Sequence, residues 1–361
     1  MTSRERFLAT MRFQPVDRPI YWPGGPRQST LERWRKEGLP EDTSPAQLLG
    51  LDPSEGMPLN LGPLPRFEAK VIEDRGRYKI WMDELGAKRL DFTVDETPGF
   101  VTRTWLEFPV TDRASFREMQ QRFNPDDPAR YPEDWEARVE RWRQRECPLS
   151  LTMPSLFWRV RDWVGFETIC TLIYDDPALL HEMMDFWADF VVRAIRRAVG
   201  ETEIDYVILN EDMCYKTASM ISPAHVREFM FPGYRRIVEC LRGGGIEFIF
   251  MDSDGYTGEL VPLWLQVGIN GLNPIEIAAG NDPVAYRKQY PRELLMLGGI
   301  DKRELRTTKQ AVEREFAKVP WLVAQGGYIP CVDHGIPPDV PWENYVHLVE
   351  LIKGIRLDQG A

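Results

Sequence analysis

The chain has 361 residues, of which 43% are hydrophobic and 28% charged, a balance typical of a folded, water-soluble protein and not of a disordered, collagen-like or coiled-coil chain. Its 45 Lys and Arg residues against 56 Asp and Glu residues leave a net charge of −11. Because such a charge repels phosphate groups, neither nucleic acid nor a membrane surface is an expected partner.

The cysteine content and the first residues indicate a cytoplasmic protein. The five cysteines include no C-x-x-C pair, which favours reduced thiols over a disulfide framework. Residues 1–11 carry charges where a secretory signal needs an apolar core, and Thr2 and Glu5 have the spacing of a helix capping box. No run of about 18 apolar residues predicts a transmembrane helix.

Residues 1–147 have an irregular pattern, rich in proline and glycine in their first half. We interpret them as an elaboration of one domain spanning residues 1–361, since no linker-like tract separates them from the rest. The pattern predicts a helix at 30–37, antiparallel strands within 67–92 that turn at Gly76 and Gly86, and helices at 112–122 and 133–145.

Residues 148–361 alternate strand and helix in a regular way. Pro177 and Pro223 suit the first turns of two of the helices, with Asp176 and Ser222 as their caps. The expected elements are strand 148–153, helix 175–199, strand 204–209, helix 222–242, strand 246–251, helix 257–267, strand 271–274, helix 283–289, strand 294–297, helix 308–319, a strand near 322–329 and helix 342–355.

Strands separated by single helices pair in parallel, so the pattern predicts an α/β fold, either a doubly wound sheet or a (β/α)8 TIM barrel. We favour a single barrel with an elaborated N-terminal region. The glycine-rich phosphate-binding motifs G-x-G-x-x-G and G-x-x-x-x-G-K-[ST] do not occur. Gly243 to Gly245 follow a helix and are better interpreted as its C-cap.

Acidic residues follow five consecutive predicted strands, at the barrel end where active sites lie. A helix-capping role is an alternative for each residue alone, but it explains the set less well, because a cap needs only one of Asp252 and Asp254. Convergent carboxylates either raise one another's pKa values or hold a cation. The acidic residues are Glu211, Asp212, Asp252, Asp254, Glu276, Asp301, Asp333 and Asp339.

His334 is the one of the four histidines that lies in a loop after a predicted strand; the others fall in predicted helices. Asp252, Asp254 and His334 could hold a metal ion with a fourth position open, and this ligand set is compatible with zinc or manganese. Cys331 could add a thiolate, although packing in a turn explains it equally well. Trp22, near the first candidate strand, could line the pocket or belong to the core.

Several motifs resemble the uroporphyrinogen decarboxylase superfamily, which includes true decarboxylases and cobalamin-dependent methyltransferases. The motifs are S-R-E-R-F-L-A at residues 3–9, P-V-D-R-P at 15–19, I-S-P at 221–223, R-E-F at 227–229, P-G-Y at 232–234, G-G-I-D at 298–301 and G-I-P-P-D-V at 335–340. The resemblance extends over essentially the whole chain and implies a (β/α)8 barrel with a cleft at the carboxyl ends of the strands.

The resemblance also bears on the reaction. True decarboxylases of the superfamily carry an R-Q-A-G-R element that holds the substrate's propionates, of which only Arg27 and Gln28 are present here. An acidic rim would moreover repel a polycarboxylate tetrapyrrole. The methyltransferases place zinc on an H-x-C pair and a later cysteine. The corresponding positions look like Asp252, Asp254 and His334, whose oxygen-rich set better suits polarisation of an ether, hydroxyl or carboxylate than activation of a thiol.

We therefore predict a methyltransferase-like enzyme that moves a methyl group between a small O- or N-methylated substrate and a corrinoid on a partner protein. In this scheme the metal lies on Asp252, Asp254 and His334, and Glu211 or Asp212 handles the proton. Tyr215 helps to position the substrate. Further substrate contacts are predicted for Trp22, Arg27, Glu276 and Asp301.

Two alternatives stay open at this point. One is a metal-free decarboxylase or lyase, in which His334 and a protonated Asp252 or Asp254 form the acid–base pair. Its substrate carboxylate would be held by Arg27, Lys302 or Arg303. The other is a barrel that binds without catalysis. The high aromatic content also makes a homodimer plausible.

Overall fold

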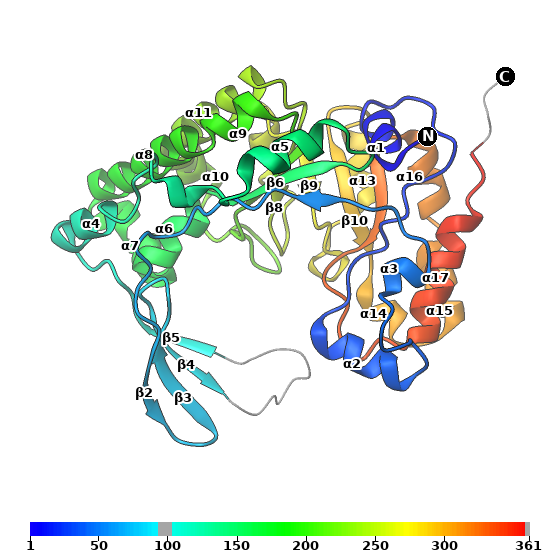
Figure 1. The fold of residues 1–361 in the computed structure, drawn as a ribbon, viewed down its shortest axis with the longest axis horizontal. Helices are drawn as coiled ribbons and strands as arrows, with labels where there is room; N and C mark the ends of the chain where they lie inside the picture. Colours follow the sequence, from blue (N-terminus) through cyan, green and yellow to red (C-terminus); the bar gives the residue numbers. More distant parts are fainter. Residues whose placement is uncertain (93–102, 358–361) are drawn as a thin grey trace.

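The computed structural model describes residues 1–92 and 103–357, which form a larger sheet flanked by helices and a smaller sheet that projects away from it (Figure 1). The larger sheet has seven strands in the order β1-β6-β7-β8-β9-β10-β11, and all of its neighbouring strands pair in parallel. Its strands are β1 (Glu55–Gly56), β6 (Leu149–Pro154), β7 (Tyr206–Asn210), β8 (Phe248–Asp252), β9 (Gly271–Asn273), β10 (Leu295–Ile300) and β11 (Tyr328–Val332).

Helices connect these parallel strands, as the sequence predicts. Asp176 and Ser222 both cap helices by accepting hydrogen bonds from backbone N–H groups. The helices are α6 (Leu156–Val164), α7 (Phe166–Asp175), α8 (Pro177–Ala194), α9 (Arg196–Glu201), α10 (Pro223–His225), a π-helical turn (Val226–Met230), α11 (Phe231–Gly243), α12 (Val261–Gln266), a 3-10 turn (Ile277–Ala279), α13 (Pro283–Gln289), α14 (Lys302–Leu305), α15 (Lys309–Phe316), α16 (Val319–Gln325) and α17 (Trp342–Gly354).

The N-terminal region supplies the second sheet, an antiparallel meander that projects from the body of the molecule (Figure 1). The predicted strands within 67–92 are present, and a fourth strand joins them beyond the expected range. The elements are α1 (Ser3–Met11), α2 (Gln28–Lys36), α3 (Pro45–Leu48), β2 (Lys70–Asp74), β3 (Tyr78–Met82), β4 (Lys88–Phe92), β5 (Arg103–Glu107), α4 (Arg113–Gln120), a 3-10 turn (Pro128–Arg130) and α5 (Trp135–Arg143).

The α/β class and the parallel sheet are confirmed, but an eight-stranded barrel is not, because the larger sheet in the described part of the chain has seven strands. The segment at residues 19–27 runs beside β11. The backbone N–H of Val332, in β11, donates a hydrogen bond to the carbonyl of Pro23 in this segment. Pro19, Pro23 and Pro26 have no N–H to donate. Because these three residues cannot donate backbone hydrogen bonds, the segment cannot form a regular strand ladder there.

The strand predicted near 322–329 is displaced in the structure. Residues up to Gln325 form α16, and β11 begins at Tyr328. Gly326 and Gly327 separate the two elements, both with positive φ angles of 74° and 62°. The glycines predicted to belong to the strand thus form the turn that precedes it, where the left-handed backbone favours glycine.

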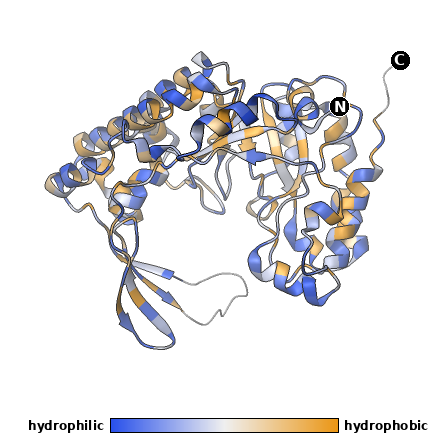
Figure 2. Ribbon diagram, viewed as in Figure 1, coloured by the Kyte–Doolittle hydropathy of each residue, from blue (hydrophilic) through white to orange (hydrophobic). Residues whose placement is uncertain are grey.

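The curled sheet has an inner and an outer hydrophobic cluster, and its strands are largely hydrophobic (Figure 2). Side chains alternate between the two, so that Tyr206 belongs to the inner cluster while Val207 belongs to the outer one. Phe7 of α1 completes the inner cluster, with its ring centroid 4.8 Å from that of Tyr206 and 5.9 Å from that of Phe248. Helix α1 therefore closes the amino-terminal end of the sheet, and the opposite end stays open.

Among residues 1–92 and 103–357, no helix is both long enough and apolar enough to cross a bilayer.

The Phe7→Ala variant tests this closure. Phe7 is 1% exposed, so the cavity left by its ring should lower the free energy of unfolding by about 3–5 kcal/mol in urea titrations followed by circular dichroism. Phe166→Ala is the control, because Phe166 is 44% exposed and its removal should cost less than about 1 kcal/mol. Equal losses in both variants would contradict the closure by α1.

Candidate functional site

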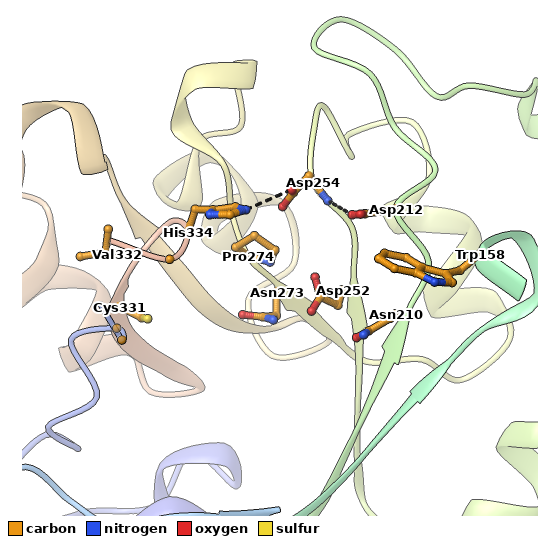
Figure 3. Close-up of a pocket in the computed structure, with 13 residues that line it drawn as sticks. Trp158, Asn210, Asp212, Asp252, Asp254, Asn273, Pro274, Cys331, Val332 and His334 are labelled. Atoms are coloured by element: carbon orange, nitrogen blue, oxygen red, sulfur yellow. Dashed lines mark hydrogen bonds and ion pairs between the residues drawn. The ribbon is translucent and has the colours of Figure 1, made fainter. Parts of the chain in front are cut away.

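A cavity of about 360 Å³ opens at the carboxyl ends of the parallel strands (Figure 3). Asn210, Asp252 and Asn273 end β7, β8 and β9, and the strand register places Asn210 opposite Asp252 and Asp252 opposite Asn273. Their polar side chains therefore form one row. The cavity is lined by Gly24, Gly25, Trp158, Asn210, Asp212, Asp252, Asp254, Asn273, Pro274, Cys331, Val332, His334 and Gly335.

Three carboxylates converge in this cavity. Asp212, Asp252 and Asp254 each offer an oxygen that lies within 4.8 Å of the others. The loop after β7 turns back through Asp212, whose φ of 40° is left-handed, a conformation that Asp tolerates better than most residues. The backbone N–H of Asp254 then donates to Asp212 Oδ1 over 3.1 Å, which holds the two loops together.

Burial and crowding keep these acids from ionising freely. Burial, with the charges of Asp212 and Asp254, raises the pKa of Asp252 to about 7. Burial also raises the pKa of Asp212. Near neutral pH the cluster therefore carries a proton for part of the time, and a cation placed among the oxygens would release it.

His334 lies at the edge of the acidic cluster (Figure 3). Its Nε2 is 3.2 Å from Asp254 Oδ2, and its Nδ1 is 3.2 Å from Arg27 Nη2. Because a guanidinium only donates, Nδ1 is the acceptor and Nε2 carries the hydrogen directed at Asp254. The hydrogen bond to Asp254 raises the pKa of His334, and the charge of Arg27 opposes this effect.

The predicted metal ligands are brought together with one change. Asp252 and Asp254 belong to the carboxylate cluster, but its third member is Asp212, whereas His334 touches the cluster through Asp254 alone. The loop that carries His334 follows β11, which is separated from β8 in the sheet by the two strands β9 and β10. Cys331 lines the cavity, and burial raises the pKa of its thiol to about 12, which keeps the thiol protonated.

The structure does not place Glu211 in the cavity. Its carboxylate is fully buried and accepts hydrogen bonds from the Tyr234 hydroxyl and from the backbone N–H of Trp158. Burial raises the pKa of Glu211 to about 7. Glu211 thus fixes the start of α6, and with it Trp158, so it supports the wall of the cavity and has no direct path to a substrate there.

Other predicted contacts also lie outside this cavity. Tyr215 and Glu276 line a neighbouring space of about 350 Å³ that reaches Asp254, and Glu276 accepts hydrogen bonds from Gly255 and Lys302. Asp301 caps α14 and pairs with Arg303. It therefore has the helix-capping role that the sequence analysis gave as the alternative to a functional one. The Trp22 indole donates to the Asp52 carbonyl and packs against the inner cluster.

In the decarboxylase alternative, Arg27, Lys302 or Arg303 was predicted to bind the substrate carboxylate. Lys302 lies 3.3 Å from Glu276 and 3.5 Å from Asp333, and Arg303 is paired with Asp301. Both cations are therefore already partnered by acids. Arg27 reaches the site by its contact with His334.

Two polar lining residues, Asn210 and Asn273, were not singled out in the sequence. Asn273 lies beside Asp252 only because β8 and β9 pair in this register, which a single sequence does not reveal. Trp158 lies in the first turn of α6, where the sequence fits a cavity wall and ordinary packing equally well. The available signal was the position of Asn210 and Asn273 at the ends of predicted strands.

Comparisons with known proteins agree with the observed α/β fold. The family model described as uroporphyrinogen decarboxylase (URO-D) matches residues 160–355, more than half of the chain. The chain therefore belongs to the uroporphyrinogen decarboxylase family, as its motifs indicated.

Individual relatives are distant. A uroporphyrinogen decarboxylase of Legionella pneumophila (strain Corby) is 23% identical, with 98% of this chain and 97% of the relative covered. The chloroplastic enzyme of Zea mays is also 23% identical, but over 53% of this chain and 47% of the relative. The chain thus spans about half the length of several curated relatives that it matches. A methyltransferase from Methanosarcina mazei has the same fold, with a TM-score of 0.63, 15% identity and 98% of both chains covered.

The Glu211→Gln variant tests the buried carboxyl. The pKa of a Glu side chain is near 4.5 in the unfolded chain, and that of Glu211 in the folded protein is about 7. Between these two pH values the unfolded state binds fewer protons than the folded state. The free energy of unfolding therefore falls as the pH rises. The loss amounts to about 3 kcal/mol and should be absent in Glu211→Gln.

Urea unfolding from about pH 5 to pH 8, in the presence of a chelator, measures this slope. Glu259→Gln, at an exposed position, should keep the wild-type slope. Parallel profiles for wild type and Glu211→Gln would show that Glu211 ionises in the folded protein as it does in water.

Proposed function

We propose that this member of the uroporphyrinogen decarboxylase family is a metal-assisted methyltransferase. It would move a methyl group from a small O- or N-methylated substrate to a corrinoid on a partner protein. The observation that carries the proposal is the convergence of Asp212, Asp252 and Asp254, whose carboxylate oxygens lie within 4.8 Å of one another. The fold shared with a methyltransferase is consistent with it.

The charge of the cavity argues against a tetrapyrrole polycarboxylate as substrate. Three aspartates line the cavity, and Arg27, the remaining arginine of the decarboxylase motif, is in contact with His334. Anionic groups brought against these carboxylates would be repelled and would gain few counter-charges. A neutral or cationic methylated group meets no such repulsion.

The residues fit a hard divalent cation. Three carboxylate oxygens are ligands typical of magnesium, manganese or, with nitrogen ligands, zinc. Asp212, Asp252 and Asp254 would hold the ion. When bound, the ion would supply Lewis acidity toward the oxygen or nitrogen that carries the methyl group.

The other residues have separate roles in this proposal. The Asn210 and Asn273 amides flank Asp252 and would orient the substrate's polar atoms, while Trp158 walls the cavity. After the methyl group leaves, the departing oxygen or nitrogen holds an electron pair and takes a proton. His334 would donate that proton from Nε2 as the imidazolium ion, which requires Nδ1 to give up its contact with Arg27, and the neutral imidazole left behind would regain a proton from solvent.

A second candidate is a metal-free decarboxylase or lyase, favoured by the pKa of about 7 of Asp252, which suits a general acid. In that case Asp252 would protonate the carbon left after carbon dioxide departs. This reaction would need neither a corrinoid nor a metal ion.

Metal content separates the two candidates. Protein purified without added metal or chelator should contain about one divalent ion per chain by plasma mass spectrometry, and Asp252→Asn should bind it at least about tenfold more weakly. Glu259→Gln should match the wild type. Absence of metal from folded wild-type protein, with no binding of added zinc, manganese or magnesium, would contradict the metal-assisted reaction.

Turnover tests the reaction itself. With reduced corrinoid protein and a panel of small methyl ethers and methylamines, the wild type should produce the absorption spectrum of a methylated corrinoid. Asp252→Asn and His334→Gln should slow its formation at least about a hundredfold. Release of carbon dioxide from carboxylated substrates, without corrinoid and unaffected by chelator, would instead establish the decarboxylase.

A further inference from the structure

A second cavity, of about 490 Å³, is lined in part by residues that neighbour those of the acidic cavity. Trp158 lines the acidic cavity, and the next residue, Arg159, lines the second cavity. Likewise Pro154 lines the second cavity, and its register partner Asn210 lines the first. The lining of the second cavity is Pro58, Leu59, Asn60, Leu61, Gly62, Pro63, Arg66, Glu84, Leu85, Thr152, Pro154 and Arg159.

Arg159 is the unusual member of this lining. It is 4% exposed, and its guanidinium lies against Trp187, with Cζ 4.6 Å from the ring centroid. One ion pair, from Nη1 to Asp162 Oδ2 at 3.3 Å, is present, and Nε has no hydrogen-bond partner among the described residues. A guanidinium stays charged in proteins and has five N–H groups to satisfy, so this is an incompletely compensated buried cation.

A neighbouring arginine shows what complete compensation looks like. Arg130 is 1% exposed and, like Arg159, packs near the ring of Phe123. Unlike Arg159, however, its guanidinium donates hydrogen bonds to four backbone carbonyls. Those acceptors belong to Asn60, Gly62, Arg122 and Asn124. Arg130 therefore ties the loop together, a structural role that Arg159 does not share.

The other charges in the cavity leave the field of Arg159 largely uncancelled. Arg66 and Glu84 form an ion pair with each other and are exposed at the mouth. Asp162 is only half-buried and contacts the guanidinium through a single pair of atoms 3.3 Å apart, so it offsets this charge only in part. The remaining lining is mostly apolar, from Pro58, Leu59, Leu61, Pro63 and Leu85.

We propose that the cavity at Arg159 binds the carboxylate of a small organic acid with a short apolar chain. This inference rests on the proposed function: the carboxylate is the far end of the substrate whose methylated end lies at the three aspartates. Arg159 would meet it with two N–H groups, as guanidinium and carboxylate commonly do.

Binding of butanoate, measured by ligand-observed NMR, tests the anion site without metal, corrinoid or turnover. Wild type should bind butanoate and not butanamide or butylammonium, and Arg159→Gln should weaken binding at least about tenfold. Arg235→Gln, an exposed arginine on α11, is the matched control and should bind as the wild type does. Equal binding by Arg159→Gln and wild type would overturn the proposal.

Asp162→Asn supplies an independent result should Arg159→Gln fail to fold. It frees the guanidinium of its partner, so butanoate should bind several-fold more tightly. Unchanged or weaker binding by folded Asp162→Asn would contradict the assignment of Arg159.

A longer probe, 4-methoxybutanoate, tests whether the carboxylate belongs to the substrate. It should compete with butanoate and bind more tightly, and Asp252→Asn should remove the added affinity but leave butanoate binding intact. No added affinity would mean an anion site separate from the substrate, which overturns that part of the proposal. Failure of methyl transfer alone would leave both binding results standing.

Discussion

The parallel register of β7, β8 and β9 is the constraint on which the site depends. It places Asn210, Asp252 and Asn273 side by side at one end of the sheet, while α1 closes the other end with Phe7. Asp212 and Asp254 follow two of these strands and meet over Asp252. A slip of one residue in any pair would turn a polar end residue to the opposite face, so packing of the inner cluster also fixes the chemistry.

The acids of the site differ in what burial does to them. Glu211 is sealed under the first turn of α6, where two hydrogen bonds give it a structural task. Asp252 has the same raised pKa, of about 7, but it faces a cavity and has other carboxylates as neighbours. Equal pKa values thus arise at a structural support and at the position for which we propose a reactive role, and only the exposure to the cavity separates the two.

The sequence predicted the strand and helix order of residues 148–361 well, because apolar runs and proline-capped helices are local signals. The acidic rim followed from the rule that parallel strands direct their ends to one edge. What the sequence could not supply is the geometry of the loops. That Asp212 joins Asp252 and Asp254 in the carboxylate cluster, with His334 at its edge, depends on the left-handed backbone of Asp212 and on how the loops after β7, β8 and β11 pack. In the described residues the larger sheet has seven strands, and the segment that runs beside β11 contains Pro19, Pro23 and Pro26, which have no N–H to donate.

The opposite charges of the two cavities constrain any substrate more strongly than either cavity alone. A carboxylate is repelled by Asp212, Asp252 and Asp254 but stabilised at Arg159, so the direction in which a small acid lies would be set by charge before any shape is matched. Trp158 and Arg159 are consecutive on α6, and Glu211 holds the first of them. The buried carboxylate of Glu211 therefore positions the boundary between the two cavities. In the proposed binding mode, the first turn of α6 would therefore set the distance between the two ends of the bound molecule.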